Sequence, residues 1–107
     1  MSKSSKVYRL DKFIVSAKAR DEFLAKILST HAILRQQPGF IQDTVLEQMS
    51  GSGKFNIVTI VEWQSQDAIN AAQIIVQELH AKNDFSPQQT MQRLGIQADI
   101  ANYAPVN

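Results

Sequence analysis

The segment at residues 54–63 constrains the fold of this chain more than any other part of the sequence. Its apolar side chains occupy both odd and even positions: Phe55, Ile57, Val58, Ile60 and Val61. Successive side chains of a β-strand point to opposite faces of its sheet. A strand that is apolar on both faces is therefore expected at the centre of a sheet, with both of its faces covered.

Two longer segments have the period of a helix. Between about residues 18 and 37, buried-type side chains recur at spacings of three and four: Phe23, Ile27, His31 and Leu34. Ser16 is expected to cap this helix, and Pro38 with Gly39 to end it. A second helix is predicted from its N-cap, Ser65, to about residue 81.

The remaining segments complete the order of elements. Strands are predicted at residues 7–15, 40–49, 54–63 and 96–104, and the hairpin between the middle two turns at residues 50–53. Ser86 followed by Pro87 predicts a short third helix that Gly95 ends. The chain is thus expected to be α+β, with the ferredoxin-like order β-α-β-β-α-β, an antiparallel sheet and its helices on one face. Residues 7–107 form one domain, and residues 1–6 are expected to be a disordered tail.

The second face of this sheet also requires cover. Apolar side chains occupy both parities in the other strands, as Phe13 and Ile14 do in the first. No segment of the chain is left to cover that face. We therefore expect a homodimer that packs through the sheet face, which would form a dimeric α+β barrel.

Composition excludes several classes of function. Eleven basic and ten acidic residues leave a net charge of +1, so the chain lacks the clustered basic surface of a nucleic-acid binder. No segment is apolar and long enough to span or enter a membrane, and we expect a cytoplasmic protein. The chain has no cysteine and only two histidines, outside any metal-binding spacing, so no metal site and no cofactor is expected.

Three stretches carry a resemblance to a known family. They are residues 30–40 (THAILRQQPGF), residues 55–65 (FNIVTIVEWQS) and residues 94–100 (LGIQADI). With its Pro-Gly-Phe turn and its Glu-Trp strand end, the chain resembles the antibiotic biosynthesis monooxygenase (ABM) domain family over nearly its whole length. The resemblance implies a ferredoxin-like dimer with a pocket between helices and sheet in each subunit. Family members include cofactor-independent oxygenases of phenols and quinols, haem-degrading proteins and isomerases.

The chain departs from the catalytic residues of those family members. The polyketide-oxidising members have an asparagine four residues before the strand-end tryptophan and a tyrosine six after it, where this chain has Thr59 and Ile69. The haem-degrading members use an asparagine on the first strand, which is absent here, and a histidine on the second helix. His80 lies on that helix, but close to its predicted end.

His31 and Trp63 are the candidate catalytic residues, each with a structural alternative. His31 lies on the apolar stripe of the first helix and can act as a base towards a phenol or quinol, or be a core histidine bonded to a carbonyl. Trp63 can stack on an aromatic substrate or simply fill the core. Thr59 can orient a ligand, although threonine is also a good strand former. Glu62 is a candidate supporting acid, or a solvated carboxylate at a strand end.

The sequence thus favours a monooxygenase that acts without a cofactor on a small aromatic, phenolic or quinol-type ligand. The expected substrate-binding residues are Thr59, Phe23, Ile27, Phe40 and Ile57. The alternative is a non-catalytic, dimeric module of the same fold that binds a small apolar or aromatic molecule.

Overall fold

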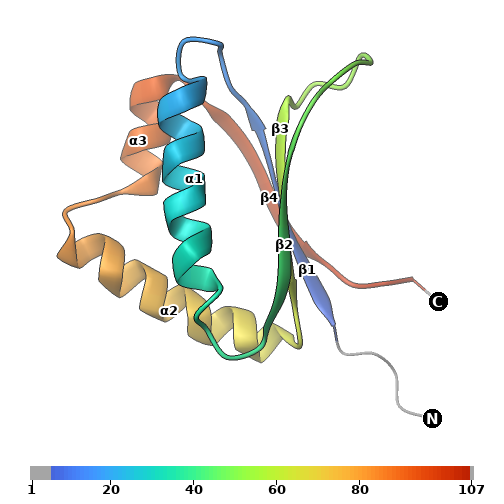
Figure 1. Ribbon diagram of the computed structural model, residues 1–107, viewed down its shortest axis with the longest axis vertical. Helices are drawn as coiled ribbons and strands as arrows, with labels where there is room; N and C mark the ends of the chain where they lie inside the picture. Colours follow the sequence, from blue (N-terminus) through green and yellow to red (C-terminus); the bar gives the residue numbers. More distant parts are fainter. Residues whose placement is uncertain (1–5, 107) are drawn as a thin grey trace.

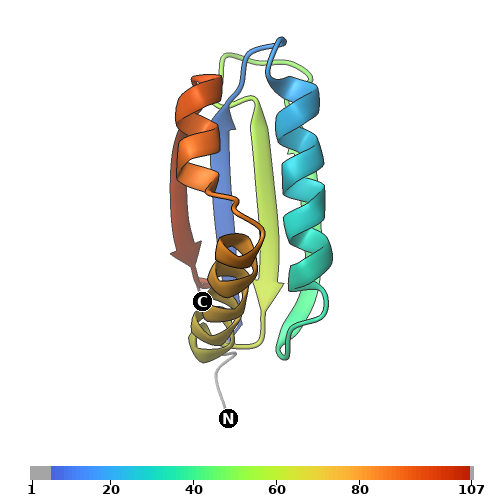
Figure 2. The same cartoon turned by 90° about the vertical axis from the view of Figure 1, so that its left-hand side faces the viewer.

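A computed structural model describes residues 6–106 of the chain as one antiparallel sheet covered by helices. The elements follow in the order β1 (Val7–Ile14), α1 (Arg20–Leu34), β2 (Phe40–Glu47), β3 (Ile57–Trp63), α2 (Gln66–Lys82), α3 (Pro87–Leu94) and β4 (Gln97–Tyr103). The strands lie in the order β2-β3-β1-β4, and every neighbouring pair is antiparallel. All three helices lie on one side of the sheet (Figures 1 and 2). The predicted ferredoxin-like α+β fold is confirmed.

The helix ends follow from local hydrogen bonding. Ser65 Oγ accepts from the backbone N–H of Ala68 at 3.1 Å, and Ser86 Oγ accepts from that of Gln89 at 3.2 Å. Both serines are therefore the predicted N-caps, of α2 and α3. The prediction that Ser16 caps α1 is wrong. Its Oγ accepts from Ala19 at 3.2 Å, which closes a turn before α1 begins at Arg20.

The loop of the hairpin between β2 and β3 is longer than the four-residue turn predicted from its glycines and serines. Strand pairing stops at Glu47 and Ile57 rather than continuing to residues 49 and 54. The side-chain amide of Gln48 donates to the carbonyls of Gly51 and Gly53, at 3.4 and 3.0 Å. The backbone N–H of Gln48 still donates to the carbonyl of Asn56 at 2.9 Å, and beyond this bond the hairpin tip projects from the rest of the sheet (Figure 1).

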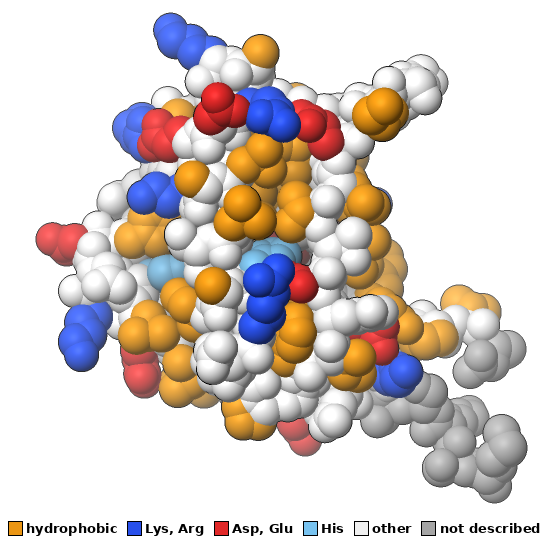
Figure 3. All heavy atoms as spheres, in the orientation of Figure 1, with side chains coloured by type: hydrophobic (Ala, Val, Ile, Leu, Met, Phe, Trp, Pro, Cys, Tyr) orange, Lys and Arg blue, Asp and Glu red, His pale blue; other side chains and the backbone are white. Residues whose placement is uncertain are grey.

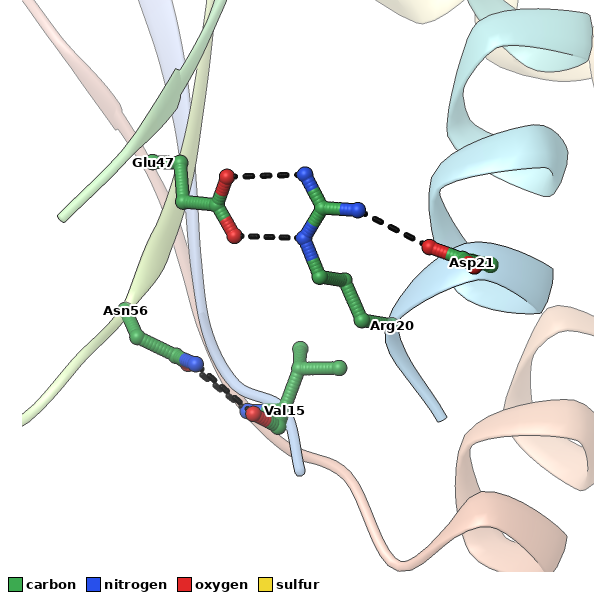
Figure 4. Close-up of polar contacts among 5 residues, drawn as sticks. All are labelled: Val15, Arg20, Asp21, Glu47 and Asn56. Atoms are coloured by element: carbon green, nitrogen blue, oxygen red, sulfur yellow. Dashed lines mark hydrogen bonds and ion pairs between the residues drawn. The ribbon is translucent and has the colours of Figure 1, made fainter. Parts of the chain in front are cut away.

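Two side-chain contacts fix α1 and the end of β1 to the sheet (Figure 4). The amide of Asn56 pairs with both backbone groups of Val15, at 2.7 and 2.8 Å. The guanidinium of Arg20, at the start of α1, donates two hydrogen bonds to the carboxylate of Glu47 at the end of β2, at 2.6 and 2.9 Å. These hydrogen bonds hold the pKa of Glu47 below its usual value. The first turn of α1 is thus anchored over the sheet edge.

The core between helices and sheet is divided into two clusters. The Phe13 cluster consists of Phe13, Val15, Ala19, Phe23, Ile27 and Ile57. The Trp63 cluster consists of Val61, Trp63, Ile69 and Ala72. Strand register places Arg9, Asp11 and Thr59 on the same face of the sheet, between the two clusters. The middle of the covered face is therefore polar.

The opposite face of the sheet carries no helix (Figure 1). Register places Tyr8, Leu10, Val58 and Ile60 there, all half-buried, beside the more exposed Leu46 and Tyr103. Glu62 also lies on this face.

Glu62 is not the solvated strand-end carboxylate that its position suggested. It is only 5% exposed, accepts a hydrogen bond from Gln42 at 2.9 Å and pairs with Lys6 at 3.3 Å. Of the tail expected at residues 1–6, only Lys6 lies within the described residues. No helix in that described range is long and apolar enough to cross a membrane.

A polar cavity between the helices and the sheet

Two adjoining cavities, of about 210 and 290 Å³, lie between the helices and the sheet. Both are lined by Arg9, Asp11, Thr30, His31, Thr59, His80 and Pro87. Since these shared residues line both, the two cavities form one continuous space. Binding sites for small ligands span roughly 300–1,000 Å³, and this space reaches that range.

His31 is buried at the wall of this space and bonded to a carboxylate. It projects from α1, and its Nδ1 lies 2.7 Å from Oδ2 of Asp43 on β2. The same carboxylate accepts two hydrogen bonds from Arg35, at 3.0 and 3.2 Å. Burial opposes ionisation of Asp43, but the hydrogen bonds from Arg35 and His31 outweigh it and lower the pKa of this carboxyl group. Asp43 is therefore an ionised acceptor at neutral pH.

The ionised carboxylate determines the tautomer of His31. A carboxylate only accepts hydrogen bonds, so Nδ1 of His31 must carry a proton and donate it to Asp43. In the neutral imidazole the other nitrogen, Nε2, then carries the lone pair. Nε2 has no hydrogen-bond partner among residues 6–106. Every fully buried polar side-chain atom in that range has a partner, so Nε2 is not fully buried. This lone pair is therefore accessible from the cavity that His31 lines.

The same reasoning places the polar atoms of Thr59 and Trp63 at the cavity surface. Both residues line the larger cavity, and both are at most 2% exposed as whole residues. Neither the hydroxyl of Thr59 nor the indole N–H of Trp63 has a hydrogen-bond partner within the described part of the chain. Every fully buried polar side-chain atom in that part has a partner, so these two groups are not fully buried. Trp63 is held by edge-to-face packing on Phe40, with ring centroids 5.8 Å apart. A hydroxyl and an indole N–H are thus available to a bound molecule.

Of the expected substrate-binding residues, three line the space and two lie behind it. Phe23 and Ile27 line the smaller cavity, and Thr59 lines both. Ile57 has no exposed surface and supports the Phe13 cluster from the sheet. Phe40 packs against Trp63 rather than against the cavity.

An ion pair on β1 forms the polar floor of the space. Arg9 Nε donates to Asp11 Oδ1 at 2.6 Å, and the two side chains are 25% and 23% exposed. No sequence pattern indicated a role for this pair. In the sequence Val7–Ile14, charged and apolar residues occupy both parities, and only the register with β3 shows which parity faces the helices.

His80 lies in the last turn of α2, as its sequence neighbours suggested, and its half-buried side chain also lines the cavity. Its ring packs edge-to-face on Phe85, with centroids 4.8 Å apart, and burial lowers its pKa. The ammonium group of Lys26 lies over the ring of Phe85, with Nζ 5.1 Å from the ring centroid. Histidine atoms reach the surface among apolar side chains in Figure 3. No group of three potential metal ligands occurs within residues 6–106.

The fold and this cavity define the class of the protein: a ferredoxin-like α+β domain with a cavity between its helices and its sheet. A family model described as antibiotic biosynthesis monooxygenase matches residues 7–73 of the 107. The chain therefore belongs to the antibiotic biosynthesis monooxygenase family. A search of curated proteins by sequence finds no match.

Solved structures share the fold at low identity. SnoaB, a cofactor-independent oxygenase from Streptomyces nogalater, is 20% identical with a TM-score of 0.68, over 96% of this chain and 95% of that one. MhuD, a haem-degrader from Mycobacterium tuberculosis, is 19% identical with a TM-score of 0.71, over 94% and 96%. A dabb family protein from Mesorhizobium loti is 14% identical with a TM-score of 0.66, over 95% and 98%. At these identities the likeness extends to the fold alone.

Proposed function

We propose that this protein is a monooxygenase that uses no cofactor and oxidises a small phenol- or quinol-type aromatic molecule in the cavity. One observation carries the proposal: His31, oriented by Asp43, presents an accessible Nε2 lone pair to a space that Thr59 and Trp63 also line. Family membership supports an oxygenase-like activity. The substrate type rests on the chemistry of the cavity.

The residues divide the work in a simple way. His31 Nε2 removes a proton from an acidic C–H or O–H of the bound ring system, and Asp43 stabilises the imidazolium that forms. Trp63 offers an aromatic face and an indole N–H, and the Thr59 hydroxyl donates to an oxygen of the substrate. The apolar walls hold the ring and exclude water, as Phe23 and Ile27 do in the smaller cavity.

Oxygen then reacts with the substrate anion. The anion gives one electron to O2, and the resulting radical and superoxide combine into a C–O–O⁻ peroxide. The peroxide takes up the proton held on His31, and loss of water leaves a carbonyl group. In total a CH2 group and O2 become C=O and H2O, so all four electrons come from the substrate.

We propose further that two chains associate through the uncovered face of the sheet. Leu10, Val58 and Ile60 lie in the middle of that face, where a solvated sheet would carry polar side chains. Leu46 and Tyr103 are 47% and 43% exposed at its margins. Burial of these groups against the same surface of a second copy would remove them from water.

Oxidation of anthrone tests the catalytic proposal. We expect oxygen uptake with formation of anthraquinone, and ¹⁸O2 should label the new carbonyl. His31→Gln should lower the rate by roughly 10²–10⁴-fold, the usual contribution of a general base. Asp43→Asn should also lower it, because an amide does not stabilise the imidazolium. Asp67→Asn, the same change at an exposed position of α2, should leave the rate unchanged.

A non-catalytic binding module is the second candidate, favoured by the absence of the asparagine and tyrosine partners at Thr59 and Ile69. It predicts that anthrone binds and alters the fluorescence of Trp63 with no oxygen uptake above buffer. Unchanged turnover in His31→Gln would remove the base role. A Soret shift on addition of haemin would contradict cofactor-free chemistry.

A further inference from the structure

We propose that the aromatic ligand of this cavity carries a carboxylate, which the guanidinium of Arg9 binds. The inference rests on the proposed use of the cavity as a binding site and goes further by naming the substrate class. It is independent of whether oxygen chemistry follows, because binding can be measured without turnover.

Arg9 is placed for this role by the register of the sheet. It pairs with Val61 of β3 and Asn102 of β4 and lines both parts of the space. Only its Nε is engaged, in the 2.6 Å bond to Asp11. The two terminal NH2 groups of Arg9 have no hydrogen-bond partner within residues 6–106. Every fully buried donor in that range has a partner, so these NH2 groups are not fully buried. These two groups therefore open onto the cavity.

The orientation of the guanidinium suits a carboxylate. Arginine presents its N–H donors in a rigid planar fork that binds a carboxylate through two parallel hydrogen bonds. Asp11 occupies the Nε position and holds the plane of the fork, which leaves the terminal edge for the ligand. Asp11 thus acts as a positioning residue for Arg9.

Fold stability does not explain this ion pair. Arg9 and Asp11 lie on the inner face of a central strand, between the Phe13 and Trp63 clusters. With side chains 25% and 23% exposed, the pair is partly desolvated, and well-packed apolar residues at such a site are commonly as stable or more so. The pair replaces core packing with open polar groups at the middle of the domain, which is the expected cost of a binding site.

The charge of the lining also favours an anion. Arg9 and Lys26 are cations, and Asp11 is the single carboxylate among the described lining residues. Asp43 lies behind His31 and is paired with Arg35. Burial lowers the pKa of His80, so this ring adds no charge at neutral pH. The site without ligand therefore carries a net positive charge, which a single carboxylate neutralises.

The position of Arg9 also relates the carboxylate to the chemistry. Arg9, Thr59 and His31 belong to the lining that both cavities share. A carboxylate bound at Arg9 leaves the ring system free to extend along the apolar walls of either cavity, within the space onto which His31 opens. The contact with Arg9 thus keeps the ring system close to the base.

Binding of 2-naphthoate compared with 2-naphthol tests the inference. The ligands share a ring system and differ in the carboxylate. Titration calorimetry measures their affinities, and the fluorescence of Trp63, the only tryptophan of the chain and a lining residue, reports occupancy of the cavity. We expect 2-naphthoate to bind about ten- to a hundredfold more tightly, as for a charge-assisted, bidentate contact.

Variants of Arg9 test whether its guanidinium is the group that binds the carboxylate. Arg9→Gln should remove the preference for naphthoate, and Arg9→Gln/Asp11→Asn should do so without an unpaired carboxylate in the cavity. Lys54→Gln, which removes one positive charge in the exposed hairpin, should retain the preference. Equal affinities for the two ligands in the unaltered protein, or a preference that survives both Arg9 variants, would overturn the inference.

The outcomes also separate this inference from the oxygenase proposal. A naphthoate preference that depends on Arg9, with no oxidation of anthrone or of an anthrone that carries a carboxylate, supports the anion site and removes the oxygenase. Oxidation of anthrone with no preference for naphthoate supports the oxygenase and removes the anion site.

Discussion

At their centres, the two faces of the sheet are reversed relative to an ordinary two-layer domain. The face under the helices has polar residues at its centre, namely Arg9, Asp11 and Thr59. The face without helices has apolar residues at its centre, such as Leu10 and Ile60. Neighbouring residues of the same two strands thus point polar side chains inward and apolar ones outward.

This reversal suits the two sides of the same strands to different roles. Polar groups on a covered face lower the stability that apolar packing would provide. Here these polar groups line a cavity, where they are available to a ligand. An uncovered face that keeps apolar groups favours a protein surface over water. The inner side of β1 and β3 therefore suits ligand binding, and the outer side suits assembly.

The largest effect is expected where the covered face is an ordinary core. Ile57 has no exposed surface and lies in the Phe13 cluster. Ile57→Ala should lower the free energy of unfolding by about 2–5 kcal/mol, because it removes buried methyl groups and leaves a void. Urea denaturation measures the change. Ile74→Ala, at a side chain that is 57% exposed on α2, should change it by less than about 0.5 kcal/mol.

The outer face is tested by a charge placed at its centre. Ile60→Lys should convert a dimer at micromolar concentration into a monomer, because an unpaired ammonium group would have to be buried between the sheets. Analytical ultracentrifugation distinguishes the two species. Ile74→Lys makes the same substitution on the helical side and should leave the dimer intact. A monomer in the unaltered protein would contradict the proposed assembly.

A smaller effect is expected at the polar centre of the inner face. Thr59→Val removes a hydroxyl that has no partner among the described residues. Its effect on the free energy of unfolding should stay within about 1 kcal/mol, whereas ligand affinity should fall. Thermal denaturation and calorimetric titration measure the two quantities. A loss of several kcal/mol would mean that this hydroxyl serves the core rather than the cavity.

The smallest expected effect is a pH dependence at the cavity wall. Burial lowers the pKa of His80 below its ordinary value of 6.5, so the unfolded chain binds a proton more readily than the folded one. Stability should therefore decline as pH falls below 6.5 towards the folded-state pKa, and His80 should contribute nothing above 6.5. Urea denaturation at pH 7.5 and 5.5 should show a smaller decline in His80→Gln. An equal decline would assign the dependence to other groups.

Periodicity predicted the elements well because each depends on local spacing and caps. Ser65 and Ser86 cap α2 and α3 as their sequences indicate. The bond between His31 and Asp43 could not be predicted, because it joins α1 to a strand residue that has the appearance of a solvated acid. Arg9 and Asp11 were missed for a related reason. Pairing with β3 determines which alternate residues of β1 face the helices. The eight residues of β1 carry charged and apolar side chains on both faces, so their sequence alone does not reveal the inward face.

Gly39 gives the molecule a point at which the size of its binding space can be changed. The residue has a φ of +88°, and a β-carbon on it would lie 2.4 Å from the β-carbon of Ala68, in the first turn of α2. Any larger residue would push the start of α2 away from β2. The same helix carries Ile69 and Ala72, which line the larger cavity beside Trp63. A protein engineer who wanted to admit bulkier rings could therefore act on this turn, remote from the acid-base pair, and leave the reacting groups in place.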